Sequence, residues 1–178
     1  SDASFLQYPT EIAVITNVEA DHLVNWGTPE AYADGFRAFA TRPKVAHVVI
    51  NVDDPGSRAP ADQLVGEARH IVRYGESEDA DVRITDVVAH GLGVAATLTY
   101  GDESGRIELL VPGNHNLANA SAAYAGGRLL GLSHDEAVAA RRVRNRVFWE
   151  LADLDRLVCQ RGTHAFRSDP RSLRLFAA

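Results

Sequence analysis

The first 75 residues alternate between short apolar runs and helix-start signals, and this alternation limits the fold more than any other feature of the sequence. The run at residues 12–15 is continuous and rich in β-branched side chains, as in a strand that is buried on both faces of a parallel sheet. Thr28 and Pro29 supply an N-cap and a proline at the first helical position. We therefore predict a βαβαβ unit, with strands at residues 12–15, 46–52 and 70–74 and helices that begin at Thr28 and near residue 61.

The pattern changes after Gly75, where three strand-like stretches are joined by short glycine-containing turns of hairpin length. Pro112 and Gly113 then break the pattern, and an alanine-rich helix is expected to follow. Ser133 and Glu136 have the spacing of a capping box for one more helix. The fold class predicted is α/β, a doubly wound, mostly parallel sheet with a small antiparallel three-stranded annex, made of residues 82–89, 94–100 and 106–111.

Composition limits the class of protein. The 178 residues are 46% apolar and 24% charged, as expected for one globular domain. No apolar run approaches the roughly 20 residues of a membrane helix, so we expect no membrane association. The single cysteine, Cys159, can form neither an internal disulfide nor a cysteine-rich metal site, which favours the cytoplasm. Methionine is absent, even at position 1, so we expect the chain to be a fragment.

Charge and apolar spacing both change near Ala140. Residues 1–140 carry a net charge of −11 and residues 141–178 a net charge of +5. A basic tail can serve as a nucleic-acid arm, but this one lacks lysine and has almost no interleaved aromatic residues, so we expect no nucleic-acid partner. We predict a domain at residues 1–140 and an atypical basic tail at residues 141–178, which is frameshifted or otherwise non-native.

The loop after the first predicted strand contains an imidazole, His22, close to the carboxylates of Glu19 and Asp21. Ligands of doubly wound sheets bind at the carboxyl ends of the strands, so these side chains are well placed for a metal ion or a polar substrate. The alternative is an acidic cluster with a surface histidine. Spacing does not separate the two, because histidine is an unusual ligand for Mg²⁺.

A second group, His115, Asn116 and Asn119, lies at the start of the predicted alanine-rich helix. A carboxamide offers a donor and an acceptor side by side, which matches the N6 and N7 edge of adenine. The alternative is that the asparagines only cap the helix. Asp53 and Asp54 are interpreted as turn residues, and no role is assigned to a further set, His47, His70, His90, His134 and Cys159. No phosphate-binding Gly-x-x-x-x-Gly-Lys-Ser/Thr motif occurs in the chain.

Four motifs together resemble the central, ATP-binding domain of the Mur ligase family. They are Ser1-Asp2-Ala3-Ser4-Phe5-Leu6, Thr16-Asn17-Val18-Glu19-Ala20-Asp21-His22-Leu23, Asn51-Val52-Asp53-Asp54-Pro55-Gly56 and Pro112-Gly113-Asn114-His115-Asn116-Leu117-Ala118-Asn119-Ala120. The resemblance implies that ATP phosphorylates a substrate carboxylate and that an amine then attacks the acyl phosphate, with Mg²⁺ balancing the phosphate charge. It implies that His22 is the Mg²⁺ ligand and that His115, Asn116 and Asn119 bind adenine. The substrates implied are UDP-N-acetylmuramate and L-alanine, in peptidoglycan synthesis.

The resemblance is incomplete at both ends of the chain. The family's Gly-Lys-Thr loop and an acidic metal-binding residue would lie upstream of Ser1, and two family motifs expected beyond Ala140 are absent. We therefore expect a ligase fragment that is inactive alone, and assign no catalytic residue. The alternative is a standalone nucleotide- or metabolite-binding module.

Overall fold

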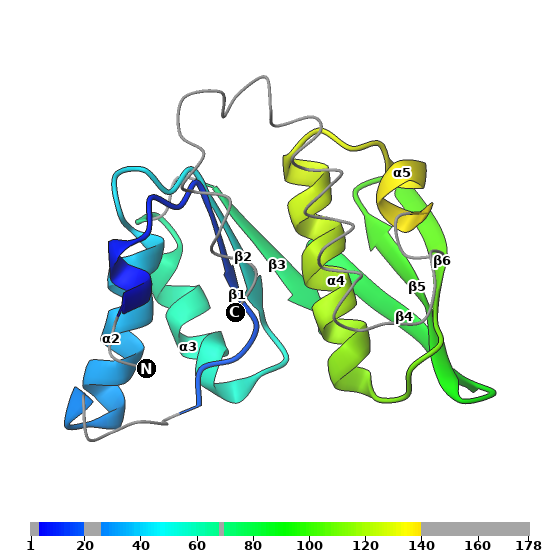
Figure 1. Cartoon of the computed structure of the whole chain (residues 1–178), viewed down its shortest axis with the longest axis horizontal. Coiled ribbons are helices and arrows are strands. Elements are labelled where there is room, and N and C mark those ends of the chain that lie inside the picture. The colour runs from blue at the N-terminus through cyan, green and yellow to red at the C-terminus, as the bar shows by residue number, and fades with distance from the viewer. Residues whose placement is uncertain (1–3, 20–25, 68–69, 140–178) are drawn as a thin grey trace.

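The computed structural model describes residues 4–19, 26–67 and 70–139. In these residues six strands form one mixed sheet, in the order β1-β2-β3-β4-β5-β6 (Figure 1). Neighbouring strands are parallel from β1 to β4 and antiparallel from β4 to β6. The strands are β1 (Ile12–Ile15), β2 (His47–Asn51), β3 (Ile71–Gly75), β4 (Val82–His90), β5 (Gly93–Tyr100) and β6 (Glu103–Leu109).

Helices cover both faces of the sheet, so the predicted α/β fold class is confirmed. Alternate residues of β2 face opposite sides, and Val48 and Ile50 belong to a core with α2 and α3 whereas Val49 packs with α4. Figure 1 shows α2 and α3 together over one part of the sheet and α4 and α5 over the other. The helical elements are the 3-10 turn η1 (Ser4–Gln7), α2 (Pro29–Ala40), α3 (Pro55–Leu64), α4 (Asn114–Leu129) and α5 (His134–Ala139). None of the described helices is long and apolar enough to cross a membrane.

The helix starts follow from the capping residues. Thr28 caps α2, because its side chain accepts a hydrogen bond from the N–H of Ala31 at 3.1 Å. The predicted start of the next helix near residue 61 is wrong. It begins at Pro55, because Asp54 caps it and Pro55 occupies the first helical position. The start was missed because Asp53, Asp54, Pro55 and Gly56 were interpreted together as a turn.

The antiparallel annex is a continuation of the main sheet, because β4 pairs with β3 in parallel and with β5 in antiparallel. The predicted capping box is confirmed, since the N–H of Glu136 donates to Ser133 Oγ and Glu136 Oε2 accepts from the N–H of Ser133 at 2.9 Å. His134 is buried at the start of α5, with its Nδ1 2.8 Å from the Tyr124 hydroxyl of α4. This contact joins α5 to α4.

One prediction about burial is wrong. Val14 of β1 is 46% exposed, so residues 12–15 are not buried on both faces. Among the described strands β1 lies at the edge of the sheet. α4 packs chiefly on β2 and β3 and contacts β1 less, so it leaves one face of β1 partly uncovered.

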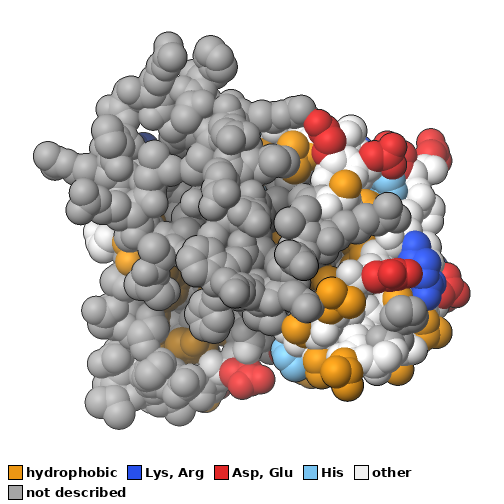
Figure 2. Space-filling model, turned by 45° about the vertical axis from the view of Figure 1, so that its right-hand side comes forward, with side chains coloured by type: hydrophobic (Ala, Val, Ile, Leu, Met, Phe, Trp, Pro, Cys, Tyr) orange, Lys and Arg blue, Asp and Glu red, His pale blue; other side chains and the backbone are white. Residues whose placement is uncertain are grey.

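Figure 2 shows another face of the molecule. Acidic side chains are spread over the described part of this surface, and the basic ones form no extended tract there.

Candidate functional site

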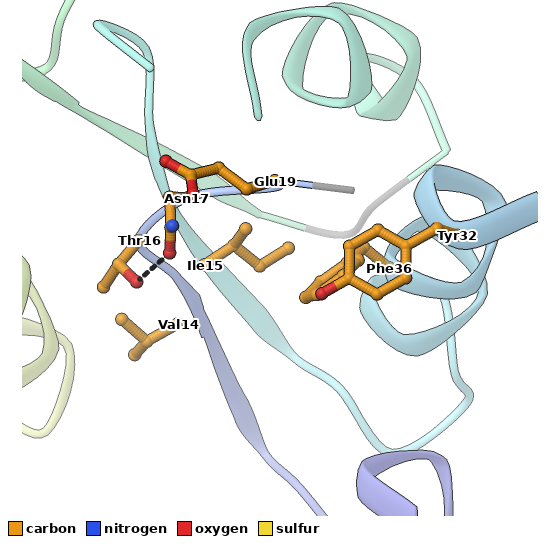
Figure 3. A pocket seen from close by; sticks show the side chains of 7 residues that line it. All are labelled: Val14, Ile15, Thr16, Asn17, Glu19, Tyr32 and Phe36. Carbon is orange, nitrogen blue, oxygen red and sulfur yellow. Dashed lines mark hydrogen bonds between the residues drawn. The ribbon is translucent and has the colours of Figure 1, made fainter. Parts of the chain in front are cut away.

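A shallow pocket of about 290 Å³ opens at the carboxyl end of β1 (Figure 3). Its walls combine a polar group, Thr16, Asn17 and Glu19, with an apolar group made of Val14, Ile15, Tyr32 and Phe36. The Thr16 hydroxyl donates to Asn17 Oδ1 at 3.2 Å. Oxygen atoms beside an aromatic wall at the end of a parallel strand are typical of a small-molecule site.

Asp54 fixes the loop that carries this pocket. One of its carboxylate oxygens accepts hydrogen bonds from the N–H of Val18 at 3.1 Å and from the N–H of Ser57 at 2.7 Å. The loop after β1 is thereby tied to the first turn of α3. Gly56 permits this approach, because a Cβ added there would lie 1.8 Å from the carbonyl oxygen of Val18.

Asn51 and Asp53 connect the ends of three parallel strands. Asn51 Nδ2 donates to the Thr16 carbonyl at 3.0 Å, which joins β2 to the loop after β1. The Asp53 carboxylate accepts from the backbone N–H groups of Glu76 and Ser77 and from the Ser77 hydroxyl at 2.6 Å, which joins β2 to the loop after β3. The carboxyl edge of the sheet is therefore a hydrogen-bonded platform. Asp53 and Asp54 have structural roles, as a link to the loop after β3 and as the N-cap of α3, and not as residues of the predicted turn.

Tyr74 lies directly below this platform, near the end of β3. Its side chain is fully buried, and its hydroxyl has no hydrogen-bond partner within the described residues. Burial raises the pKa of Tyr74 above its usual value of 10.0, and the negative charges of Asp54 and Asp53 raise it further. The phenol therefore stays protonated to a higher pH than that of an exposed tyrosine.

The start of α4 brings together His115, Asn116 and Asn119. The N-cap is Gly113 with φ +104°, and no side chain caps the helix, so the alternative in which the asparagines serve as caps is wrong. Asn116 Nδ2 instead donates to the Pro112 carbonyl at 2.7 Å, which orients its carboxamide. The Asn119 side chain is exposed and forms no hydrogen bond within the described residues.

The two candidate groups lie at one end of the molecule. Figure 1 shows the first turn of α4 at the end toward which β1, β2 and β3 run. No hydrogen bond within the described residues joins His115, Asn116 or Asn119 to the loops after β1 and β2. His22 lies outside the described residues. Within residues 4–19, 26–67 and 70–139, no three His, Cys, Asp or Glu side chains are grouped to hold a metal ion.

Sequence reasoning missed several residues of the site. Tyr32 and Phe36 of α2 line the pocket, although helical spacing alone only places them on one face of that helix. The bridging role of Asn51 had one available signal, its place at the end of a strand, two residues before Asp53. Tyr74 had no sequence signal, because an orphaned hydroxyl is visible only once the burial of the side chain is known.

Known proteins of one family are similar to this chain in sequence. The family model of the Mur ligase middle domain matches residues 2–127. The UDP-N-acetylmuramate--L-alanine ligase of Cutibacterium acnes is 58% identical over 138 residues, which cover 76% of this chain and 29% of that protein. The corresponding ligase of Clavibacter michiganensis is 48% identical over 139 residues. The chain thus spans about three tenths of the length of these relatives.

Solved structures support the fold. A UDP-N-acetylmuramoyl-L-alanyl-D-glutamate--2,6-diaminopimelate ligase aligns with a TM-score of 0.70 at 22% identity, over 90% of this chain and 39% of that one. The MurF ligase of Thermotoga maritima, solved in complex with ADP, aligns with a TM-score of 0.60 at 19% identity, over 86% of this chain and 40% of that one.

Proposed function

The chain belongs to the Mur ligase family, and we propose that it forms part of an ATP-dependent ligase that joins L-alanine to UDP-N-acetylmuramate in peptidoglycan synthesis. The observation that carries this proposal is the 58% identity over 138 residues to the Cutibacterium acnes ligase of that name. The chain spans 29% of that protein, so the reaction belongs to a larger molecule in which these residues supply one region. The cytoplasm is the compartment proposed for it.

The start of α4 is the proposed adenine site. The Pro112 carbonyl engages one N–H of the Asn116 carboxamide, which leaves a second N–H and the oxygen for a ligand. An acceptor and a donor side by side match the N6 amino group and N7 of adenine. Asn119 lies one helical turn further on, and its amide has no hydrogen-bond partner among the described residues; His115 is exposed beside them. These residues fit the nucleotide by their hydrogen-bonding chemistry.

The pocket beside β1 is the proposed region for Mg²⁺ and the phosphates. His22 is the proposed ligand, and it follows Glu19 by three residues in the sequence. Thr16, Asn17 and Glu19 present oxygen atoms, which Mg²⁺ prefers, so the donor set of this loop fits the ion. When bound, Mg²⁺ would balance the charge of the phosphate groups.

The platform has a positioning role in this proposal. Asp54 and Asn51 hold the loop after β1 by contacts with Val18 N and Thr16 O, so the oxygens of that loop are set before any ligand arrives. A pre-set site avoids the cost of ordering its groups on binding. No residue of the described part is assigned to the chemical step.

The 178-residue chain is proposed to be inactive alone, because its sequence holds no Gly-Lys-Thr loop. Loss of one preorganised donor from a transition-state site costs about 10²- to 10³-fold in rate, and such a loop supplies several. Residues 1–140 form the family domain in this proposal. Residues 141–178 are a basic tail without a role in it.

Calorimetric titration of the chain with adenosine and ADP tests the adenine site. We expect Asn116→Ala to weaken both ligands by about tenfold, since a net hydrogen bond contributes about 1 kcal/mol. Thr99→Ala is the matched control, because Thr99 contacts Ser104 on the antiparallel part of the sheet. Equal affinity in wild type and Asn116→Ala would remove the adenine assignment.

A further inference from the structure

Two histidines that no part of the ligase proposal uses lie against one another on the sheet. Nδ1 of His47, at the start of β2, is 3.0 Å from Nδ1 of His70, the residue before β3. Their ring centroids are 5.2 Å apart and the ring planes are nearly perpendicular, at 88°. His70 is exposed and His47 is partly exposed, so the pair is open to ions from solvent.

Backbone pairing fixes this arrangement. Val48 pairs with Ile71 in parallel register, and the N–H of Val48 donates to the His70 carbonyl at 2.8 Å. His47 and His70 are therefore neighbours one step earlier in the same register, with both side chains on one face. On its other side, the N–H of His47 donates to the Glu11 carbonyl at 3.2 Å. The two rings meet because the sheet holds their Cα atoms, not through a flexible loop.

The spacing of the nitrogens is close to that of a shared cation. Zn²⁺ binds imidazole nitrogen at roughly 2.0 to 2.1 Å, so two ligand nitrogens of a tetrahedral ion lie about 3.3 Å apart, a few tenths of an ångström more than the spacing here. Neutral imidazole suits Zn²⁺, Cu²⁺ and Ni²⁺, whereas Mg²⁺ prefers oxygen. Within the described residues, the only hydrogen-bond partner of either ring is the other ring, so a metal ion would displace no third group.

We propose that His47 and His70 form a two-imidazole site for a divalent transition-metal ion, with water in the remaining coordination positions. The site lies at the amino end of β2, whereas the pocket and its loop lie at the carboxyl ends of the strands. Ile12 of β1 pairs with His47, and the polar residues of the pocket begin at Thr16, four residues or about 13 Å further along that strand. It is therefore independent of the candidate Mg²⁺ region, and its failure would leave the ligase proposal untouched.

The test is calorimetric titration of the full 178-residue chain with Zn²⁺, in buffer that contains an excess of Mg²⁺. We expect a Zn²⁺ site that His47→Gln and His70→Gln each weaken by at least about tenfold, since even loss of a group that supports a ligand costs 10- to 100-fold. The control variants His115→Gln and His22→Gln replace other histidines and are expected to leave that site unchanged.

Absence of Zn²⁺ binding to the wild-type chain, or binding in either single variant that is as tight as in wild type, would overturn the proposal. If His22→Gln alone lost Zn²⁺ binding, the zinc site would lie in the loop after β1, and the proposal would again be overturned. Ring nitrogen NMR signals of the wild-type chain provide a measurement that needs no variant. Zn²⁺ is expected to shift the Nδ1 signals of both His47 and His70, and unshifted signals would refute the site.

Discussion

Replacement of Asp54 by alanine is expected to destabilise the chain by about 1.5 to 5 kcal/mol. The substitution removes the N-cap of α3, which costs about 0.5 to 2 kcal/mol. It also leaves the N–H of Val18 without its acceptor, and since Val18 is only 8% exposed, this donor costs about 1 to 3 kcal/mol. A domain of this size is stable by roughly 5 to 15 kcal/mol, so the variant should still fold.

Urea unfolding followed by circular dichroism measures this loss. Asp54→Asn should cost only about 1 kcal/mol, because one carboxamide oxygen can accept from both Val18 N and Ser57 N as the carboxylate oxygen does. Asp62→Ala is the matched control. The Asp62 side chain is 60% exposed and pairs with Arg73 at 3.3 Å, so its loss should cost less than about 0.5 kcal/mol.

The reasoning fails if Asp54→Ala unfolds at the same urea concentration as Asp62→Ala. It fails equally if Asp54→Asn is as unstable as Asp54→Ala, because the bridge would then depend on charge instead of on a shared acceptor. The slope of the unfolding free energy against urea concentration must stay constant across the variants for the comparison to hold.

Three further predictions concern the platform, the core and the tail. Gly56→Ala should lower the free energy of unfolding in urea by about 1 to 3 kcal/mol, because the added Cβ meets the Val18 carbonyl. The added Cβ of Gly126→Ala in α4 meets no atom within 4 Å, so this variant should be more stable than wild type by about 0.5 to 1 kcal/mol. The reverse order of stability would refute the packing argument. Tyr74→Phe should leave stability at pH 7 equal or higher. The raised pKa keeps the phenol of the folded chain protonated, whereas the phenol of the unfolded chain ionises near pH 10.0. The free energy of unfolding of the wild type should therefore fall above that pH. If Tyr74→Phe showed the same fall, the fall would not come from Tyr74. Deletion of residues 141–178 should leave the midpoint of urea unfolding unchanged, and a clear drop would show that the tail packs on the domain.

The order of elements followed from local signals in the sequence. β1, β2 and β3 are recognisable because short runs rich in β-branched and apolar residues lie between turn signals, and α2 because Thr28 and Pro29 mark its start. The start of α3 was missed because Pro55 and Gly56 were interpreted as a turn. The exposure of Val14 was missed because an apolar run does not state how far a neighbouring helix extends across the sheet.

The candidate site was predictable only in its residue types. Position at a strand end predicted a functional loop after β1, and the carboxamides at the start of α4 were singled out by their chemistry. The hydrogen bonds that hold the platform, from Asn51 to Thr16 O and from Asp53 to Ser77, link residues far apart in the sequence. Such contacts depend on strand register, which no local pattern specifies.

A chimeric ligase tests the central claim most directly. The 138 residues that align with the Cutibacterium acnes ligase would replace the matching segment of that enzyme. ADP release that depends on both L-alanine and UDP-N-acetylmuramate would then be measured, with folding checked by circular dichroism. If these residues are the middle-domain part of such a ligase, the turnover rate of the chimera should lie within about tenfold of that of the parent enzyme. That factor corresponds to a difference of about 1.4 kcal/mol in barrier height. Asn116→Ala in the chimera should raise the KM for ATP. A folded chimera that releases no ADP above a no-enzyme control would contradict the account.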